Sequence, residues 1–309
     1  MTENIINILK TALAEDLGAD GDITTAAIFN AGDMGEALIR CKRAGVLSGA
    51  TLVGPLYELV DSYFADPSMI SFMSEAERLP HAAPVPAKAA RTKTELFCAD
   101  GDFMEAGTAI CRVEGPVRSI LAGERTALNL LQRLSGVATA ARDMVKVLEG
   151  SGTRLLDTRK TTPGLRALEK AAARHGGALN HRHGLYDMIL IKDTHIKRAG
   201  GVKSALMKAF AWRGGKALPL IEVEVQSVAE FLETLALGPD RIMLDNMSAD
   251  EIEQCVEGRN ASKKGITLEA SGNVSLLTLP AIAASGVDFV SSGAITHSAP
   301  ALDIHLAMV

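Results

Sequence analysis

The sequence predicts an α/β protein with a mixed α/β N-terminal domain followed by a βα barrel. The first part of the chain mixes short β-like runs with turn signals and an amphipathic helix. After residue 116, apolar runs of strand length alternate with helix-like segments. The length of 309 residues exceeds the size at which one hydrophobic core usually suffices. We therefore expect two domains, 1–115 and 116–309, with the last ~15 residues packing back on the first domain.

The N-terminal region begins with an apolar stripe at helical spacing in residues 5–13. Short β-like runs predict strands at Ala37–Cys41 and Ala109–Val113. Between them, Val53–Phe64 carries apolar residues on one helical face, which predicts a helix packed on a sheet. A Pro-rich stretch, His81–Pro86, predicts irregular backbone.

The second region begins with a helix predicted from about Ser119 to Ser135-Gly136, where the glycine is read as a helix end. Six apolar runs follow and are expected to form strands: Leu155-Leu156, Met188–Ile191, Leu218–Val225, Ile242–Leu244, Ile266–Leu268 and Val287–Val290. Helix-like segments separate most of them, and this alternation of strands and helices is typical of a βα barrel.

Polar residues follow these apolar runs almost directly. They are Asp157 to Lys160, Lys192-Asp193, Glu224, Asp245-Asn246, Glu269 to Gly272, and Ser291 to Gly293. Taken singly, each group is explained by helix capping or loop closure. Because barrel enzymes place their chemistry at the C-terminal ends of parallel strands, six such groups in register indicate a catalytic mouth.

The charge is concentrated in one part of the chain. The net charge of −5 argues against nucleic acid or an anionic membrane as the main partner. Residues 154–198 nevertheless hold ten Lys or Arg against four acids, so the rest of the chain carries −11. A solvated helix face explains Arg166, Lys170 and Arg174 at i, i+4, i+8 spacing. Arg159 and Lys192 fit that explanation less well and favour a small polyanionic ligand.

Two further patterns suggest ligands for a polyanion. Glu224 and Asp245 each end an apolar run, and their oxygens suit a hard cation such as Mg²⁺. Gly272 and Gly293 lie at the last two strand ends, where barrels bind phosphate through backbone N–H groups. His181-x-His183 has a metal-like spacing, but the intervening Arg182 and the lack of a nearby carboxylate in the sequence favour anion binding instead.

The cellular setting is predicted from what the sequence lacks. Its four cysteines form no CxxC pair, so neither a disulfide framework nor a thiolate zinc site is expected. Neither a secretory segment nor a membrane-spanning apolar run is apparent. These observations predict a cytoplasmic protein with no membrane partner.

Eight collinear motifs carry a resemblance to a known family over nearly the whole chain. They are AEDLGADGDITT (14–25), GERTALNLLQRLSG (123–136), DTRKTTPGLRALEK (157–170), NHRHGLYDMILIKDTHI (180–196), IEVEV (221–225), IMLDNM (242–247), EASGN (269–273) and SSGAITHSAPALDI (291–304). The sequence thereby resembles the quinolinate phosphoribosyltransferase, or carboxylating nicotinate-nucleotide pyrophosphorylase, family. The resemblance implies an incomplete, seven-stranded βα barrel and a homodimer with shared active sites.

The family resemblance also implies the reaction and the residue roles. Phosphoribosyl pyrophosphate and quinolinate would give nicotinate mononucleotide, CO₂ and pyrophosphate for NAD synthesis. The implied quinolinate contacts are Arg125 from the partner subunit, Arg159, His181, Arg182 and Lys192. The implied phosphoribosyl pyrophosphate contacts are Thr158, Lys160, Glu224, Asp245, Ser271, Gly272, Gly293 and His297. Lys160, Glu224 and Asp245 would be catalytic, and Glu224 and Asp245 would hold Mg²⁺ directly or through water.

Three other functions compete with this interpretation. One is a related family associated with molybdenum transport; the 157–166 block and Leu131–Leu134 argue against it, because they resemble the quinolinate enzyme. Another is a transferase that uses nicotinate without decarboxylation, which would need fewer cations around the ring. The third is a non-catalytic barrel that binds a sugar phosphate. The sequence departs from the commonest family pattern at Thr194, His183 and Asn273, none of which removes a proposed charged contact.

Overall fold

The computed structural model describes residues 2–18, 20–66 and 91–309. The chain divides into two compact units, Met1–Thr139 with Pro300–Val309, and Ala140–Ala299. The Pro-rich stretch 81–86 lies outside the described residues. In the described part of the chain, no helix is both long and apolar enough to cross a membrane.

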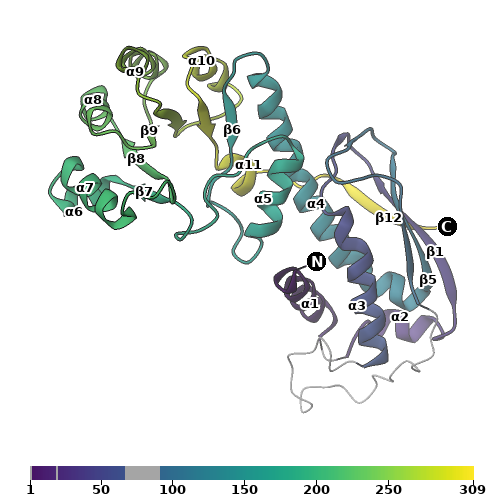
Figure 1. Ribbon diagram of the computed structural model, residues 1–309. Helices are drawn as coiled ribbons and strands as arrows, with labels where there is room; N and C mark the ends of the chain where they lie inside the picture. The colour runs from purple at the N-terminus through teal and green to yellow at the C-terminus, as the bar shows by residue number, and fades with distance from the viewer. Residues whose placement is uncertain (1, 19, 67–90) are drawn as a thin grey trace. The chain divides into compact units, whose positions relative to one another are not determined.

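The first unit is built on an antiparallel sheet of order β12-β1-β5-β3. Its strands are β1 (Met34–Cys41), β3 (Lys93–Leu96), β5 (Ala109–Pro116) and β12 (Ile304–Met308), with a separate pair of β2 (Gly45–Val46) and β4 (Phe103–Met104). Its helices include α1 (Glu3–Leu17), α2 (Ile23–Ile28), the 3₁₀ turn η1 (Ala50–Leu52) and α3 (Val53–Ala65). The three elements predicted at 37–41, 53–64 and 109–113 are confirmed (Figure 1).

The core of this unit follows from strand alternation. Ala37, Ile39 and Cys41 are fully buried along β1, as expected for one inward-facing side of a strand. They pack in one cluster with Tyr57 of α3 and with residues of the next helix along the chain, which is described below. The inward-facing side of β1 is thus part of the hydrophobic core of this unit.

Helix α4 (Val117–Leu148) is longer than the sequence predicted. The predicted end at Ser135-Gly136 is wrong, because Gly136 continues the helix. A Cβ on Gly136 would lie 2.1 Å from the Pro300 carbonyl oxygen, so the glycine permits close backbone approach instead of ending the helix. The long helix also explains why the division of the chain, after Thr139, differs from the boundary predicted after residue 115.

The second unit contains a parallel sheet of order β6-β11-β10-β9-β8-β7. Its strands are β6 (Arg154–Leu156), β7 (Ile189–Ile191), β8 (Ile221–Val225), β9 (Arg241–Asp245), β10 (Thr267–Ser271) and β11 (Phe289–Ser291). Its helices are α5 (Arg166–His175), α6 (Asp193–Ala199), α7 (Val202–Arg213), α8 (Val228–Leu237), α9 (Ala249–Ser262), α10 (Leu279–Ala284) and α11 (Ala294–His297) (Figure 1). All six strands predicted from apolar runs are confirmed.

A seventh strand, implied by the family resemblance, is reduced to one parallel bridge between Leu156 and Leu179. After Leu179 the backbone is held by a side chain instead of a strand ladder. The N–H of His181 and the side-chain amide of Asn180 donate to the Asp157 carboxylate at 2.8 and 2.6 Å. These bonds turn the chain out of the sheet.

Strand alternation places charge on one face of the parallel sheet. Along β8, Ile221, Val223 and Val225 are buried apolar residues, whereas Glu222 and Glu224 project to the opposite face. In an ordinary barrel that inner face is filled by branched apolar side chains. Here acidic residues occupy it, so this face needs compensating positive charge.

Candidate active site

The C-terminal ends of β7 and β8 bring two predicted site residues together. Lys192 directly follows β7, and its Nζ lies 3.2 Å from Glu224 Oε2. Lys192 is half exposed, and Glu224 is largely covered. A predicted substrate-binding cation is thus paired with a predicted metal-binding carboxylate, within reach of solvent.

The ends of β9 and β10 form a second group. Ser271 and Asp245 are paired in register, and the backbone N–H of Asn246 donates to the Ser271 carbonyl at 2.8 Å. A Cβ on Gly272 would lie 2.2 Å from Asn246 Oδ1, and its φ is +90°, so only glycine fits here. Asn273 has a φ of 51°, a conformation that Asn tolerates better than most residues. An asparagine therefore fits at this departure from the commonest family pattern.

A third group contains Lys160, Gly293 and His297. A Cβ on Gly293 would lie 2.8 Å from Lys160 Cδ and 3.0 Å from His297 Cδ2. The Thr296 hydroxyl donates to the Lys160 carbonyl at 2.8 Å, which ties the two loops together. The Lys160 N–H donates to Thr158 Oγ1 at 3.0 Å. The structure therefore clusters all four residues predicted for phosphate binding on these two loops.

Two guanidinium groups form the fourth group. Arg159 Nε is buried and has no hydrogen-bond partner among the described residues. Arg182 donates from Nη1 to the Met188 carbonyl at 3.2 Å. Burial lowers the pKa of Arg182, and the nearby positive charge of Arg159 lowers it further. Two cations in such proximity favour an anion between or beside them.

A buried network of hydrogen bonds holds the backbone next to Arg182, and it was not predicted from the sequence. Lys170 Nζ lies 2.5 Å from Asp157 Oδ1 and also donates to the His181 carbonyl at 2.9 Å. Lys170 is 1% exposed, so the prediction of a solvated residue on a helix face is wrong for it. Burial raises the pKa of Asp157 and lowers that of Lys170, and their mutual attraction offsets these shifts only in part. The network fixes the backbone on which His181 and Arg182 lie.

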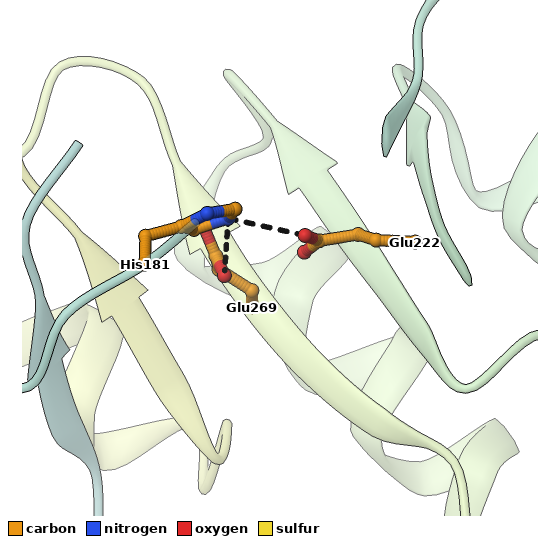
Figure 2. A group of neighbouring side chains, drawn as sticks. All are labelled: His181, Glu222 and Glu269. Carbon is orange, nitrogen blue, oxygen red and sulfur yellow. Dashed lines mark ion pairs between the residues drawn. The ribbon is translucent and has the colours of Figure 1, made fainter. Parts of the chain in front are cut away.

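A second missed feature is a buried cluster of His181, Glu222 and Glu269 (Figure 2). His181 Nε2 lies 3.1 Å from Glu222 Oε2 and 3.5 Å from Glu269 Oε2. Both glutamates are fully buried. Arg241 Nη1 lies 3.2 Å from Glu269 Oε2, and its guanidinium lies over the Phe289 ring, 4.2 Å from the centroid. Alternation along β8 and β10 could have placed these glutamates on the inner face, but it gave no sign of His181 between them.

Burial also sets the protonation of this cluster. It raises the pKa of Glu222 to about 7, against the opposing effect of Arg241. Burial raises the pKa of Glu269 to about 8, and the charge of Glu222 adds to that increase. Burial lowers the pKa of His181, although Glu269 opposes this shift. The cluster therefore favours a neutral imidazole beside carboxyl groups that hold protons more tightly than usual.

A pocket of about 330 Å³ lies at the N-terminal ends of β7 and β8. Its lining includes His181, Arg182 and Met188 with Leu218 and Leu220, which precede β7 and β8. Lys192 and Glu224 are not among its lining residues. Two predicted quinolinate contacts, His181 and Arg182, therefore line this pocket, whereas the other predicted contacts of the second unit lie at the C-terminal strand ends.

Arg125 belongs to helix α4, in the first unit, and is exposed. The other predicted site residues all belong to the second unit. Its predicted role in the active site of a partner subunit remains a prediction.

Comparison with known proteins agrees with this arrangement. Residues 22–135 match the family of quinolinate phosphoribosyl transferase N-terminal domains. Residues 137–307 match the family of quinolinate phosphoribosyl transferase C-terminal domains. A probable carboxylating nicotinate-nucleotide pyrophosphorylase from Bacillus subtilis is 37% identical, with 97% of this chain and 91% of the relative covered. A chloroplastic relative from Arabidopsis thaliana is also 37% identical, with 99% and 83% covered.

Solved structures give the same result. The crystal structure of NadC from Streptococcus pyogenes has a TM-score of 0.83 and 36% identity, with 100% of this chain and 99% of that chain covered. Human nicotinic acid phosphoribosyltransferase, at 12% identity and a TM-score of 0.62, shares the fold alone. Matches to both family domains and similarity over full length show that this chain belongs to the quinolinate phosphoribosyltransferase family.

Proposed function

We infer that this protein is a carboxylating nicotinate-nucleotide pyrophosphorylase. It transfers phosphoribosyl from phosphoribosyl pyrophosphate to quinolinate, with decarboxylation, in NAD synthesis. The observation that carries this function is full-length similarity to relatives with that activity in their names, at 37% identity. The clustered cations at the strand ends support it, because both substrates are polyanions.

Quinolinate binding is assigned to the guanidinium and ammonium groups near β6 and β7. Arg159 has a buried Nε with no hydrogen-bond partner among the described residues, and a substrate carboxylate would supply one. Burial lowers the pKa of Arg182, and repulsion from the nearby Arg159 lowers it further. Lys192 adds a third cation, and Arg125 of a partner subunit would add a fourth. Four cations suit a dicarboxylate better than a single carboxylate.

Phosphoribosyl pyrophosphate is assigned to residues at the ends of β6, β8, β9, β10 and β11. Lys160, His297 and the backbone at Gly293 would bind phosphate oxygens, and Thr158 lies beside Lys160. Ser271 and Gly272 would bind the second phosphate group through a hydroxyl and backbone N–H groups. Glu224 and Asp245 would accept hydrogen bonds from the ribose hydroxyls.

Glu224 and Asp245 also fit Mg²⁺. They lie at the ends of neighbouring strands, and carboxylate oxygens are the donors that this ion prefers. Lys192 lies against Glu224, so a water-mediated contact fits that side better than a direct bond. Bound Mg²⁺ would offset negative charge on the departing pyrophosphate.

The chain's own residues mainly position the substrates and offset their charge. The pyridine nitrogen attacks the anomeric carbon of the ribose as its bond to pyrophosphate breaks, so the sugar passes through an oxocarbenium-like state. Glu224 and Asp245 would stabilise that positive charge, and Lys160 would stabilise the leaving group. The carboxylate next to the quaternised nitrogen then leaves as CO₂, the electron pair of the broken C–C bond stays on the ring carbon, and that carbon takes up a proton from water. No protein nucleophile is needed.

The assembly and the location belong to the same proposal. A homodimer would bring Arg125 of one subunit to the site of the other. We expect the enzyme to work in the cytoplasm, although curated relatives include chloroplastic and mitochondrial forms. No nucleic acid or membrane partner is proposed.

The test is an assay of the purified protein with phosphoribosyl pyrophosphate and Mg²⁺, with quinolinate or nicotinate as the acceptor. Formation of nicotinate mononucleotide from quinolinate alone supports the proposal. Formation from nicotinate alone assigns the non-decarboxylating activity instead. If neither acceptor reacts while phosphoribosyl pyrophosphate binds, a non-catalytic binding protein becomes the better description.

A further inference from the structure

Three residues other than glycine have a positive φ in the described part of the chain: Asn246, Lys263 and Asn273. Lys263 is the C-cap of α9, and this conformation ends many helices. The two asparagines instead lie directly after β9 and close after β10, next to the proposed ribose and phosphate contacts. Such backbone conformations cost free energy, and they persist only where the surrounding structure holds them. We therefore looked for what holds these two residues and what they contact.

The side chains of the two asparagines form a series of hydrogen bonds that ends on Asp245. Asn273 Nδ2 donates to Asn246 Oδ1 at 3.2 Å, and Asn246 Nδ2 donates to Asp245 Oδ2 at 2.9 Å. Because an amide has one accepting and one donating group, the bond from Asn273 fixes which of them faces Asp245. The bond from Asn246 is the one hydrogen bond that the Asp245 carboxylate accepts from the described residues.

Asn246 is also held by its backbone and by Gly272. Its backbone N–H donates to the Ser271 carbonyl at 2.8 Å. Its Oδ1 lies so close to Gly272 that a Cβ added there would be only 2.2 Å away. The Asn246 side chain is exposed, but these neighbours restrict its rotation. It therefore links the carboxylate at the end of β9 to the proposed phosphate-binding turn at the end of β10.

Asn273 is held by the loop that it begins. The Thr278 hydroxyl donates to the Asn273 carbonyl at 3.0 Å, and the Ser275 N–H donates to the Thr278 hydroxyl at 3.0 Å. Asn273 is one of the positions at which this chain departs from the commonest family pattern. A glycine there would adopt the same φ without strain, but it could not donate to Asn246. The asparagine therefore adds a contact that the backbone conformation does not itself require.

We propose that Asn246 and Asn273 are positioning residues that hold the Asp245 carboxylate in one orientation, with Oδ2 bound to the amide and Oδ1 left for the ribose or Mg²⁺. A carboxylate that is oriented before the substrate arrives binds at a lower entropy cost. The inference rests on the proposed function, because that function assigns Asp245 to phosphoribosyl pyrophosphate and Mg²⁺.

A purely conformational role is the competing explanation. Asparagine tolerates a positive φ better than most residues other than glycine, so the backbone alone could account for both side chains. That explanation predicts that glycine serves equally well at positions 246 and 273. Glycine substitutions therefore separate the two explanations, because they keep the backbone conformation and remove only the amide.

Binding of phosphoribosyl pyrophosphate with Mg²⁺ is measured by calorimetry without quinolinate, so that no turnover occurs. We expect Asn246→Gly to raise the Kd about tenfold and Asn273→Gly about threefold, since Asn273 contacts Asp245 only through Asn246. Lys263→Gly is the matched control, because it relieves the same backbone conformation at an exposed position on the end of α9. It should bind as the native protein does. Native affinity in both asparagine variants would overturn the proposal.

A double-mutant cycle tests whether Asn246 acts through Asp245. In an Asp245→Ala background, Asn246→Gly should change the Kd about twofold or less, because the carboxylate that it orients is gone. The same tenfold loss in that background would show that Asn246 acts in another way and would refute the positioning role.

A crystal structure of the Asn246→Gly protein without ligands gives a readout that is independent of binding. The Asp245 carboxylate should take more than one orientation there and a single orientation in Lys263→Gly. A single native orientation in Asn246→Gly would contradict the proposal. If Asn246→Gly does not fold, Asn273→Gly is judged by the same measurements. If the native protein binds no phosphoribosyl pyrophosphate, the proposed function fails, but the orientation of the carboxylate still tests how Asp245 is held.

Discussion

Lys192 Nζ lies 3.2 Å from Glu224 Oε2, so a cation predicted to bind one substrate neutralises a carboxylate predicted to serve the other. The pair is in contact with solvent, where an ion pair contributes about 0–1 kcal/mol to stability. It is therefore weak enough to separate when substrates arrive. This pair links the residues proposed to bind quinolinate to those proposed to bind phosphoribosyl pyrophosphate.

Glu224→Gln should lower kcat about 100-fold, or about 2.7 kcal/mol in barrier height. The change removes the negative charge opposite the developing positive charge of the sugar, and it weakens the proposed Mg²⁺ site. Steady-state kinetics at varied Mg²⁺ measure both effects, since the Mg²⁺ requirement should increase as well. The exposed Glu233 on α8 provides a control, and E233Q should behave as the native enzyme does. Native kcat in E224Q would remove Glu224 from the mechanism.

Gly293→Ala should raise the KM for phosphoribosyl pyrophosphate about tenfold, because a new methyl group displaces side chains at the proposed phosphate site. The added Cβ would lie 2.8 Å from Lys160 Cδ, and the flexible lysine would move aside. The φ of −75° at Gly293 suits alanine, so the fold should tolerate the change. Gly265→Ala is the control, since no atom lies within 4 Å of the added Cβ there. Equal KM values for the two variants would contradict the assigned phosphate site.

Arg125→Ala should abolish quinolinate turnover and leave phosphoribosyl pyrophosphate binding largely intact. Mixing it with Lys160→Ala should restore about a quarter of native activity, because half of randomly paired dimers would carry one intact site. Activity is measured after the two inactive variants are unfolded and refolded together, and each variant refolded alone serves as the control. No recovery in a verified mixed dimer would refute the shared active site.

Stability should fall as the pH rises, through Glu269. Its pKa is raised from 4.5 to about 8, so its contribution is fully present below about 4.5 and is lost as the pH rises through about 8. His181 has a lowered pKa and acts in the opposite direction below its ordinary value of 6.5. Between about pH 6.5 and 8 the carboxyl effect dominates, at up to about 1.4 kcal/mol per pH unit for each proton lost.

Chemical denaturation across that pH range measures the effect. The free energy of unfolding should decrease with pH in the native protein and decrease less steeply in Glu269→Gln. Equal slopes in the two proteins would show that Glu269 does not titrate in this way.

The sequence predicted the strands well because each one is an apolar run bounded by polar residues, as in Ile242–Leu244 and Val287–Val290. Buried parallel strands leave this signal without any knowledge of tertiary contacts. The end of α4 was mispredicted because a glycine at position 136 has the same local signature whether it ends a helix or admits Pro300. Only the folded backbone distinguishes the two.

Prediction of the site from the sequence was limited in the same way, because some of its contacts exist only in the folded structure. Residues at strand ends, such as Lys192 and Glu224, could be grouped from the sequence because barrel topology places those ends together. The burial of Lys170 could not, since helical spacing of three cations looks the same on a solvated face. The His181 cluster depends on strand register and on a loop that leaves the sheet at Leu179, and neither leaves a local signature.

The central claim is most directly tested with quinolinate carrying a labelled carboxylate next to the ring nitrogen. The protein is supplied with this substrate, phosphoribosyl pyrophosphate and Mg²⁺, and the label is followed in CO₂ and in the nucleotide. The account predicts one labelled CO₂ for each nicotinate mononucleotide, with no label in the nucleotide. Label retained in the nucleotide, or no nucleotide from quinolinate, would contradict it.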